Sequence, residues 1–239
     1  MALYPEPRLL PVGDQSLIVE FGDGIDLEVN RRAVAFARRV RESALPFVVD
    51  AVPSFTAVGI QYRIEALDRA SNALPLEQVE RAIRALLAEP IDAGLASARV
   101  VEIPVCYGGE HGADLADVAA HRGLTPEEIA RRHAATEAHV FMIGFAPGHP
   151  YIGLWDEAFD VPRRSTPRIR VPAGSVAIAN RQTVIYPFEL PGGWSLIGRT
   201  PLRLFDPRRE RPCLLEPGDR VRFVAIDADR FTQLREAQA

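Results

Sequence analysis

Apolar residues recur with two different periods in the N-terminal part of the chain. Leu17–Phe21 has the composition of a strand, and Asp26 is placed to cap a helix whose apolar residues return every three to four positions. Phe47–Val52 and Ala57–Tyr62 predict two further short strands, and Pro75 is placed to open a second amphipathic helix. The order strand, helix, strand, strand, helix is typical of the split βαβ unit of a ferredoxin-like domain.

A segment with the composition of a linker follows this pattern. Glu89–Ser97 contains both proline and glycine, and we expect the domain boundary near residue 97. Val100–Val105, directly after it, could supply the strand that closes the N-terminal sheet. The sequence therefore predicts two domains, residues 1–97 and residues 98–239, each large enough to hold a hydrophobic core of its own.

The second domain begins with helical patterns and then changes to short strands. Asp114–Arg122 predicts a helix that ends at Gly123, and Thr125 followed by Glu128 predicts a capping box at the start of a second helix. Glycine and proline are frequent in Gly144–Pro201, which indicates many turns and no long helix. We expect a compact, mostly antiparallel β-barrel here, so that the whole chain belongs to the α+β class.

The charge balance disfavours nucleic acid and membranes as partners. A net charge of -4 and a pI near 5.8 provide no positive field for a phosphate backbone, and no apolar stretch approaches the ~20 residues of a membrane span. The N-terminus resembles neither a signal peptide nor a transit peptide, and the two cysteines, Cys106 and Cys213, lie far apart. We therefore expect a cytoplasmic protein that binds a small molecule or another protein.

Lysine does not occur in this sequence. All 28 basic residues are arginine, which excludes a Schiff-base lysine, a biotinyl-lysine and the lysine of a P-loop within this chain. The common motifs of serine hydrolases, zinc proteases and dinucleotide-binding enzymes do not occur either. A catalytic, biotin-bearing or phosphate-binding lysine would therefore have to come from a partner.

The sequence contains five histidines, at positions 111, 121, 133, 139 and 149. They show no i, i+4 pairing on a predicted helix, so no metal site is expected. His133 falls on the inward face of the second predicted helix of this domain, where a core role and a functional role are both open. His149 lies with Tyr151 at the tight Pro147-Gly148 turn, and loops on a rigid barrel are common positions for binding sites.

A run of arginines follows this loop. Arg163, Arg164 and Arg168 stand among prolines that fix the backbone direction, and their guanidinium groups could bind a carboxylate or a phosphate. The alternative is a solvated edge strand that proline and charge protect from pairing.

Polar and aromatic groups continue toward residue 200. They alternate with glycines that permit turns, and the mixture suits a pocket for a small ligand: Gln182, Thr183, Tyr186, Trp194, Gly174, Gly192 and Gly193. The glycines could equally serve close strand packing, and Trp194 could belong to the core. We expect the functional face to lie within Gly144–Thr200.

Ordered sequence blocks extend along nearly the whole chain. In the second half they are Gly144-Phe145-Ala146-Pro147-Gly148, Pro162-Arg163-Arg164, Thr166-Pro167-Arg168, Val171-Pro172-Ala173-Gly174-Ser175-Val176, Gln182-Thr183, Tyr186-Pro187, Pro191-Gly192-Gly193-Trp194 and Ile197-Gly198-Arg199-Thr200. In the first half they are Gly13-Asp14, Val52-Pro53-Ser54, Glu102-Ile103-Pro104-Val105, Tyr107-Gly108-Gly109, Asp114-Leu115 and His133. Their order and spacing resemble the family of the 5-oxoprolinase B subunit, also called allophanate hydrolase subunit 1 or KipI.

This resemblance implies a small ferredoxin-like α/β domain followed by a cyclophilin-like β-barrel domain. It also implies one component of an ATP-dependent 5-oxoprolinase, which cleaves 5-oxo-L-proline to L-glutamate together with a C subunit of related fold and an A subunit. Such a chain is an amidohydrolase subunit that is inactive without its partners. The ATP would be bound by the complex, and this chain would carry no biotin.

The resemblance also suggests roles for the candidate residues. Three guanidinium groups would bind a carboxylate or phosphate: Arg163, Arg164 and Arg168. Hydrogen bonds would orient the lactam beside an indole wall, from Gln182, Thr183, Tyr186 and Trp194. Imidazole titrates near neutral pH, so the candidates for proton transfer are His133 and His149.

Two other functions are compatible with the same sequence blocks. One is a KipI-like protein that inhibits a sensor histidine kinase and catalyses nothing. The other is half of a carboxyltransferase of the urea carboxylase type, which would need a biotinylated partner. The chain differs from the usual family pattern at His149, where phenylalanine is common, and at Asn180–Val184, where the pattern is Gly-x-Gln-Thr-Gly.

Overall fold

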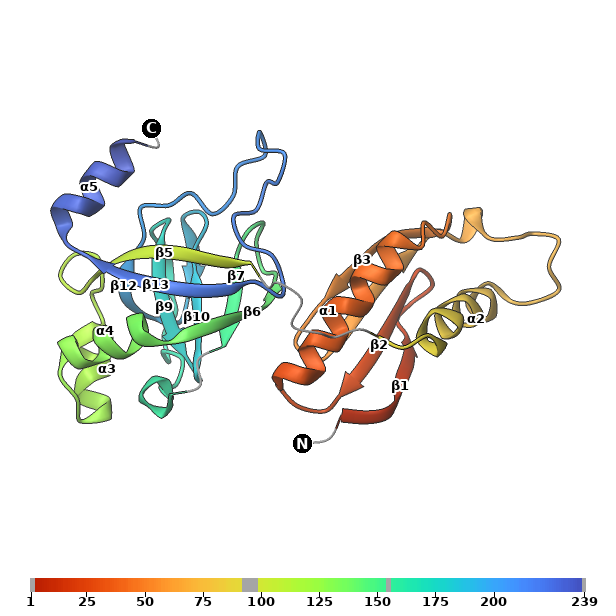
Figure 1. Cartoon of the computed structure of the whole chain (residues 1–239), viewed down its shortest axis with the longest axis horizontal. Coiled ribbons are helices and arrows are strands. Elements are labelled where there is room, and N and C mark those ends of the chain that lie inside the picture. Colours follow the sequence, from red (N-terminus) through yellow and green to blue (C-terminus); the bar gives the residue numbers. More distant parts are fainter. Residues whose placement is uncertain (1–2, 92–98, 154–155, 238–239) are drawn as a thin grey trace. The chain divides into compact units, whose positions relative to one another are not determined.

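The computed structural model describes residues 3–91, 99–153 and 156–237 (Figure 1). Contacts between residues divide the chain into two compact units, residues 1–97 and residues 98–239. Of the predicted linker Glu89–Ser97, residues 92–97, and with them the expected boundary, lie outside the described residues. Within the described ranges, no helix is both long and apolar enough to span a membrane.

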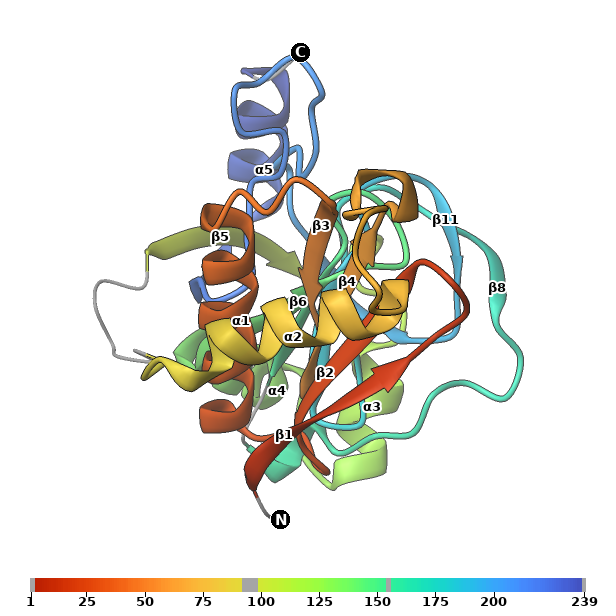
Figure 2. The ribbon, with the colours of Figure 1, turned by 90° about the vertical axis from the view of Figure 1, so that its right-hand side faces the viewer.

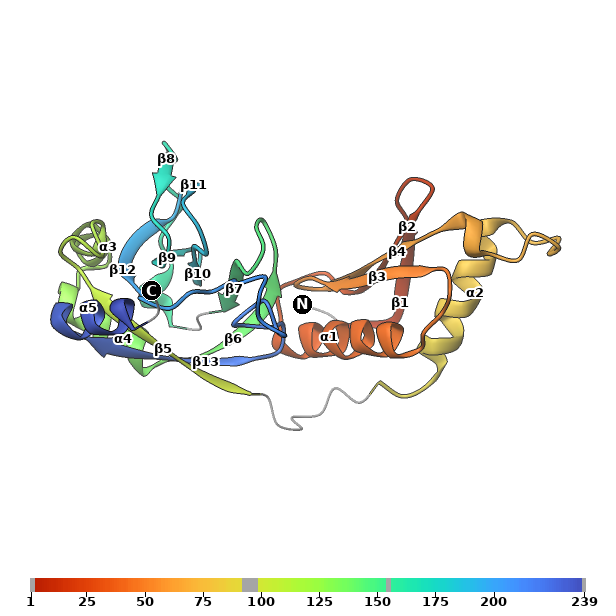
Figure 3. The ribbon, with the colours of Figure 1, turned by 90° about the horizontal axis from the view of Figure 1, so that it is seen from above.

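A four-stranded antiparallel sheet and two helices build the described part of the first unit, with strand order β1-β2-β4-β3. The elements are β1 (Leu3–Pro11), β2 (Ser16–Gly22), α1 (Leu27–Glu42), β3 (Val48–Pro53), β4 (Ala57–Tyr62), the short 3-10 helix Ile64–Ala66 and α2 (Pro75–Ala88). Figure 2 shows α2 running across the direction of α1, and Figure 3 shows α1 along one face of the sheet. Alternate residues of β4 enter the core, as the sequence predicted: Val58, Ile60 and Tyr62.

The helices of this unit begin where the sequence predicted. The Asp26 carboxylate accepts hydrogen bonds from the N–H groups of Glu28 and Val29 at 2.8 and 3.2 Å, which caps α1. Pro75 occupies the first position of α2, and the Glu77 side chain accepts the N–H of Leu74 at 2.9 Å. A side-chain cap such as that of Asp26 stabilises a helix by about 1 kcal/mol.

The suggestion that Val100–Val105 could close this sheet was wrong. Val100–Val105 belongs to the second unit, and the fourth strand of the sheet is β1 at the N-terminus. β1 lies at an edge and pairs only with β2 among the described strands, and proline is tolerated on an edge strand because one side needs no N–H donors. The three prolines in Leu3–Pro11 concealed the strand from pattern reasoning.

In the described part of the second unit, seven strands close into a barrel in the order β10-β7-β6-β13-β5-β12-β9. Their bounds are β5 (Val100–Tyr107), β6 (Glu137–Ile143), β7 (Pro150–Gly153), β9 (Ser175–Ala179), β10 (Gln182–Ile185), β12 (Ser195–Arg199) and β13 (Arg220–Ile226). β13 and β5 run parallel, and the other neighbouring pairs run antiparallel. This confirms the α+β class and the mostly antiparallel barrel.

The remaining elements of this unit are short. They are α3 (Leu115–Arg122), α4 (Pro126–Ala135), the 3-10 helix Glu157–Phe159, β8 (Arg168–Val171), β11 (Leu190–Gly192) and α5 (Ala228–Glu236). Gly123 ends α3 with a φ of 65°, and Thr125 caps α4 by accepting the N–H of Glu128 at 3.2 Å. The other half of the predicted capping box is replaced, because the Glu128 carboxylate binds Arg131 and Arg132 instead.

Two apolar clusters lie on opposite sides of the barrel wall. The first takes residues from all seven barrel strands and therefore fills the interior, with α3 and α4 packed against it. Because side chains alternate across a strand, the neighbours of these residues point outward. Part of the outward set forms a second cluster, which we call the outer cluster: Val171, Ala177, Ala179, Val184, Tyr186, Trp194 and Leu196.

Candidate functional site

Strand register builds the outer cluster from four adjacent strands. Val184 in β10 lies opposite Tyr151 in β7 and opposite Ala177 in β9, and Ala177 lies opposite Leu196 in β12. These side chains therefore form one row across the outside of the barrel. β8 and β11 pair with each other next to these strands (Figure 3) and add Val171 to the cluster.

The β11 backbone lies directly on the ring of Tyr186. A Cβ atom added at Gly192 would overlap the Tyr186 hydroxyl, whereas one added at Gly193 would meet its nearest atom, Pro167 Cγ, at 3.6 Å. Gly193 is also fixed to the arginine segment, because its carbonyl accepts the N–H of Arg164 at 2.7 Å. The glycine pair therefore serves close packing over Tyr186.

His149 is buried among aromatic rings at the edge of the outer cluster. Its ring centroid lies 5.3 Å from that of Phe145, 5.2 Å from that of Tyr151 and 5.2 Å from that of Tyr186. Only 3% of His149 is exposed, and burial lowers its pKa to about 4. Among the described residues, its Nδ1 is buried with no hydrogen-bond partner. The imidazole is therefore neutral at neutral pH and can accept a proton but not supply one.

Two of the predicted arginines converge on one carboxylate. Oδ1 of Asp114 accepts a hydrogen bond from Arg164 Nη1 at 3.0 Å and from Arg168 Nη2 at 2.6 Å. Within the described ranges, Arg168 Nη1 is buried without a hydrogen-bond partner. One carboxylate between two guanidinium groups leaves an excess of positive charge, which favours an anionic ligand. The sequence had marked Asp114 as the start of a helix and as part of an ordered block, but not as a partner of these arginines.

Arg163 is exposed and carries its charge close to two phenol groups. Burial raises the pKa of Tyr186 to about 12, and the positive charges of Arg163 and Arg168 oppose that rise. Burial also raises the pKa of Tyr151, again against the charge of Arg163. Both phenols therefore stay protonated at neutral pH and can donate a hydrogen bond to a ligand.

Two of the predicted site residues lie on the other side of the barrel wall. Thr183 has no exposed surface, and its hydroxyl donates to the Ala177 carbonyl at 3.1 Å and lies 3.3 Å from His133 Nε2. His133 is also fully buried, with Nδ1 at 2.7 Å from the Tyr107 hydroxyl, and burial lowers its pKa to about 3. These contacts support the core interpretation of His133 over the catalytic one, and they give Thr183 an internal partner in place of a ligand.

The other predicted residues frame the outer cluster. Trp194 is 9% exposed, and its ring lies 6.2 Å from that of Tyr151. Gln182 is half-buried at the far end of β10. Gly148 follows Pro147 in the β6–β7 turn with a φ of 74°, and Gly174 turns into β9 with a φ of 80°. A Cβ at Gly174 would overlap the Thr200 carbonyl, so that turn requires glycine.

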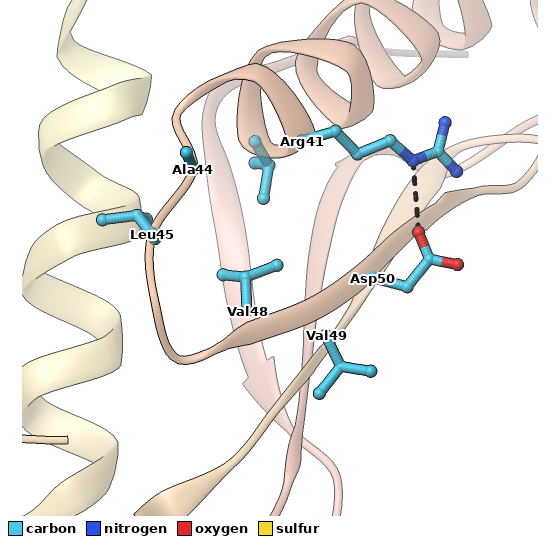
Figure 4. A pocket seen from close by; sticks show the side chains of 7 residues that line it. Arg41, Ala44, Leu45, Val48, Val49 and Asp50 are labelled. Carbon is cyan, nitrogen blue, oxygen red and sulfur yellow. Dashed lines mark hydrogen bonds and ion pairs between the residues drawn. The ribbon is translucent and has the colours of Figure 1, made fainter. Parts of the chain in front are cut away.

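A separate hollow in the first unit is lined by five apolar residues and one pair of opposite charges (Figure 4). Arg41 and Asp50 form an ion pair at its rim with 3.1 Å between Nε and Oδ1, and both side chains are about half exposed. Water screens an exposed pair of this kind, and the two opposite charges leave no net charge for an ionic ligand. The lining residues are Val40, Arg41, Ala44, Leu45, Val48, Val49 and Asp50. We therefore place the candidate site in the barrel unit.

The described residues hold no group of three or more histidine, cysteine, aspartate or glutamate side chains that could bind a metal ion. The site instead combines guanidinium donors, phenol donors, one neutral imidazole and an apolar floor. Such a surface can bind a small, partly apolar molecule that carries a carboxylate or phosphate. The imidazole supplies a proton acceptor at its edge.

Comparison with known proteins gives a consistent result over most of the chain. The family model described as "Carboxyltransferase domain, subdomain C and D" matches residues 7–215. The 5-oxoprolinase B subunit of Bacillus subtilis (strain 168) is 41% identical over 94% of this chain and 95% of its own length. The 5-oxoprolinase B subunit of Escherichia coli O157:H7 is 42% identical over 91% of this chain and 95% of its own length.

The fold also matches a solved structure. The crystal structure of the protein TTHA0988 is similar with a TM-score of 0.77 and 39% sequence identity. The match covers 90% of this chain and 40% of that chain, so the present chain spans less than half the length of that structure.

Proposed function

This chain belongs to the family of the carboxyltransferase domain, subdomains C and D, and we propose that it works as the B subunit of a 5-oxoprolinase. The two relatives described above carry that name at 41% and 42% identity over nearly the full length of both chains. Such a name implies a hydrolase complex of several chains. The sequence agrees with a shared site, because it contains no self-sufficient catalytic motif and no lysine.

The proposed reaction is the hydrolysis of a lactam. Water adds to the carbonyl carbon of the 5-oxo-L-proline ring and the bond from that carbon to nitrogen breaks, which gives the second carboxylate and the amino group of L-glutamate. We propose that ATP hydrolysis within the complex drives this step and that the partners are a C subunit of related fold and an A subunit. The ATP site is assigned to the complex and to no residue of this chain.

The contacts of Arg168 carry the proposal. This side chain has one nitrogen bound to Asp114 and another that is buried and, in the described structure, unpartnered, at the edge of an apolar surface. A substrate carboxylate would satisfy that nitrogen, with Arg163 adding positive charge beside Tyr186. Tyr186 and Gln182 would donate hydrogen bonds to the lactam, and Trp194 would form an apolar wall.

His149 is the proposed proton acceptor at this face. A pKa lowered to about 4 keeps the imidazole neutral at neutral pH, which is the form that accepts a proton from an attacking water, and it also makes His149 a weak base. His133 is left out of this role because it is sealed inside the barrel.

The proposal is tested by co-expressing this chain with the A and C subunits and measuring glutamate formed from 5-oxo-L-proline and ATP. Arg168→Ala should raise the KM for 5-oxo-L-proline about 10-fold to 150-fold, since a hydrogen bond to a charged group contributes about 1.5–3 kcal/mol. Arg170→Ala is the matched control: Arg170 lies two residues away in β8, is 79% exposed and pairs with Glu189 at 3.6 Å. An unchanged KM in Arg168→Ala would contradict the assignment.

Measurements on the isolated chain and on the complex distinguish the two alternative functions from the proposed one. A kinase inhibitor would bind a sensor histidine kinase as the isolated chain, and no combination of the three subunits would hydrolyse 5-oxo-L-proline. A carboxyltransferase half would show activity only with a biotinylated partner. Either outcome would replace the 5-oxoprolinase proposal.

A further inference from the structure

Asp114 stands at the start of α3 without capping it. An aspartate immediately before a helix normally accepts a hydrogen bond from an N–H group of the first turn. In the described structure the Asp114 side chain makes no such bond, although its main-chain carbonyl accepts the N–H of Val118 at 2.9 Å and so begins the helix. The position gives up a stabilising cap, and this indicates that the carboxylate has another task.

Three segments that are distant in sequence meet at this carboxylate. Oδ2 accepts the N–H of Leu196 in β12 at 2.7 Å, while Oδ1 accepts from Arg164 and Arg168. The main chain of Asp114 is fixed to the same strand, because its N–H donates to the Leu196 carbonyl at 2.9 Å. Only 3% of Asp114 is exposed, so these charge-assisted bonds are shielded from water and hold the carboxylate in one place.

The Asp114 carboxylate determines the orientation of the Arg168 side chain. Without the carboxylate, two guanidinium groups would repel each other at this point, and Arg168 would turn toward water. When the carboxylate is present, Arg168 Nη2 donates a hydrogen bond to Asp114 Oδ1 at 2.6 Å. Because the guanidinium group is planar, this bond also fixes the direction of Nη1. Nη1 is buried and has no hydrogen-bond partner among the described residues.

We infer that Asp114 is a positioning residue, which holds Arg168 so that its free Nη1 is presented to the carboxylate of the substrate. The inference rests on the proposed function. Asp114 does not touch the substrate in this scheme, since both of its oxygens are occupied by Leu196 and the two arginines. It acts only through Arg168.

A double-mutant cycle in the assembled complex tests this dependence. Asp114→Asn removes the charge, and we expect it to raise the KM for 5-oxo-L-proline about tenfold or more with a much smaller change in kcat. In the Arg168→Ala background the same substitution should change KM by no more than about twofold, because the residue through which Asp114 acts is already gone. If Asp114→Asn does not fold, Asp114→Glu replaces it in the cycle, because the longer side chain displaces Oδ1 from Arg168 while keeping the charge.

Asp219→Asn is the matched control for loss of a buried carboxylate. Asp219 is 6% exposed, accepts hydrogen bonds from Arg99 and accepts the N–H of Glu216 at 2.8 Å, at the start of β13. We expect a lower melting temperature with an unchanged KM. A rise in KM in this control, or KM effects of Asp114→Asn and Arg168→Ala that simply multiply, would overturn the inference and leave Asp114 a stabilising residue only.

A second measurement separates failure of this inference from failure of the proposed function. If the wild-type complex does not hydrolyse 5-oxo-L-proline, the proposed function is wrong. The guanidinium NMR signal of Arg168 in the full chain, identified by its loss in Arg168→Ala, then decides whether Asp114 positions it. Restricted rotation in the wild type that becomes free in Asp114→Asn supports the positioning role, and restricted rotation in both overturns it.

Discussion

Burial affects two histidines of the barrel unit in the same direction, but their surroundings differ. It lowers the pKa of His133 to about 3 and that of His149 to about 4. His133 has Tyr107 and Thr183 within hydrogen-bond distance of its two ring nitrogens. His149 has an unpartnered Nδ1 within the described structure and lies next to Tyr186. A satisfied histidine stabilises a core, whereas an unsatisfied one at the candidate site is available for chemistry.

Replacing His149 by phenylalanine should stabilise the barrel unit. The substitution keeps an aromatic ring and removes a buried polar atom without a partner, which we expect to raise the free energy of unfolding by about 1 kcal/mol at pH 7.5. The gain should grow at lower pH. The unfolded chain takes up a proton at His149 near pH 6.5, but the folded chain does so only near 4, so the wild type loses about 1.4 kcal/mol per pH unit between these values.

Urea unfolding at pH 7.5 and at pH 5.5, followed by tryptophan fluorescence, measures this difference. Both tryptophans, at positions 155 and 194, fall within residues 98–239 of the sequence, so their fluorescence reports on the unfolding of that part of the chain. His121→Phe is the control, because His121 is exposed on α3. Equal stabilities of the wild type and His149→Phe at pH 5.5 would contradict the prediction.

At the scale of elements, β8 and β11 position the site although they are short. They form a two-stranded sheet outside the barrel, in which Leu190 pairs with Val171 and Gly192 pairs with Arg168. The same pairing sets Arg168 beside Asp114 and brings the backbone of Gly192 onto Tyr186. The spacing between the arginine segment and Tyr186 therefore depends on glycine at position 192.

Gly192→Ala should weaken both packing and substrate binding. Its Cβ would overlap the Tyr186 hydroxyl, and relieving such overpacking typically costs about 1–3 kcal/mol. Gly193→Ala is the matched control, since its Cβ would meet only ordinary contacts at 3.6 Å, and we expect a change below about 0.5 kcal/mol. Unfolding of both variants and the KM of their complexes provide the measurement. Similar losses in the two variants would show that Tyr186 contact is not the cause.

At the scale of the whole molecule, each compact unit has a core of its own. The first unit buries residues of three strands, β2, β3 and β4, and of its two α-helices, including Phe21, Phe36 and Ile60. The second buries a separate interior cluster that includes Ile103, Ile178 and Phe223. Every strand pairing of the described barrel stays within residues 98–239.

The two units should therefore fold when produced separately. We expect a fragment of residues 1–97 and a fragment of residues 98–239 each to unfold cooperatively, because each keeps its sheet and its core. Thermal unfolding by circular dichroism tests this, and the two-dimensional NMR spectrum of each fragment should show dispersed signals. A barrel fragment without dispersed signals would contradict it.

The sequence by itself determined most local structure. Caps and period placed α1, α2 and α4, because the first turn of a helix and its apolar stripe are encoded by nearby residues. Alternation placed β4 and its buried face, and the density of glycine and proline predicted a barrel with many turns. The ordered blocks indicated the family, and the absence of lysine restricted the chemistry within this chain.

Only the tertiary structure decided which residues share a site. The sequence could not show that Thr183 and His133 face the barrel interior while Tyr186 faces outward, because the face of a strand depends on its register with distant strands. It could not show that Asp114, 50 and 54 residues from its arginine partners, is a binding partner rather than a helix cap. It also left open that Val100–Val105 closes the first sheet, since strand pairing is set by packing between segments that no local pattern specifies.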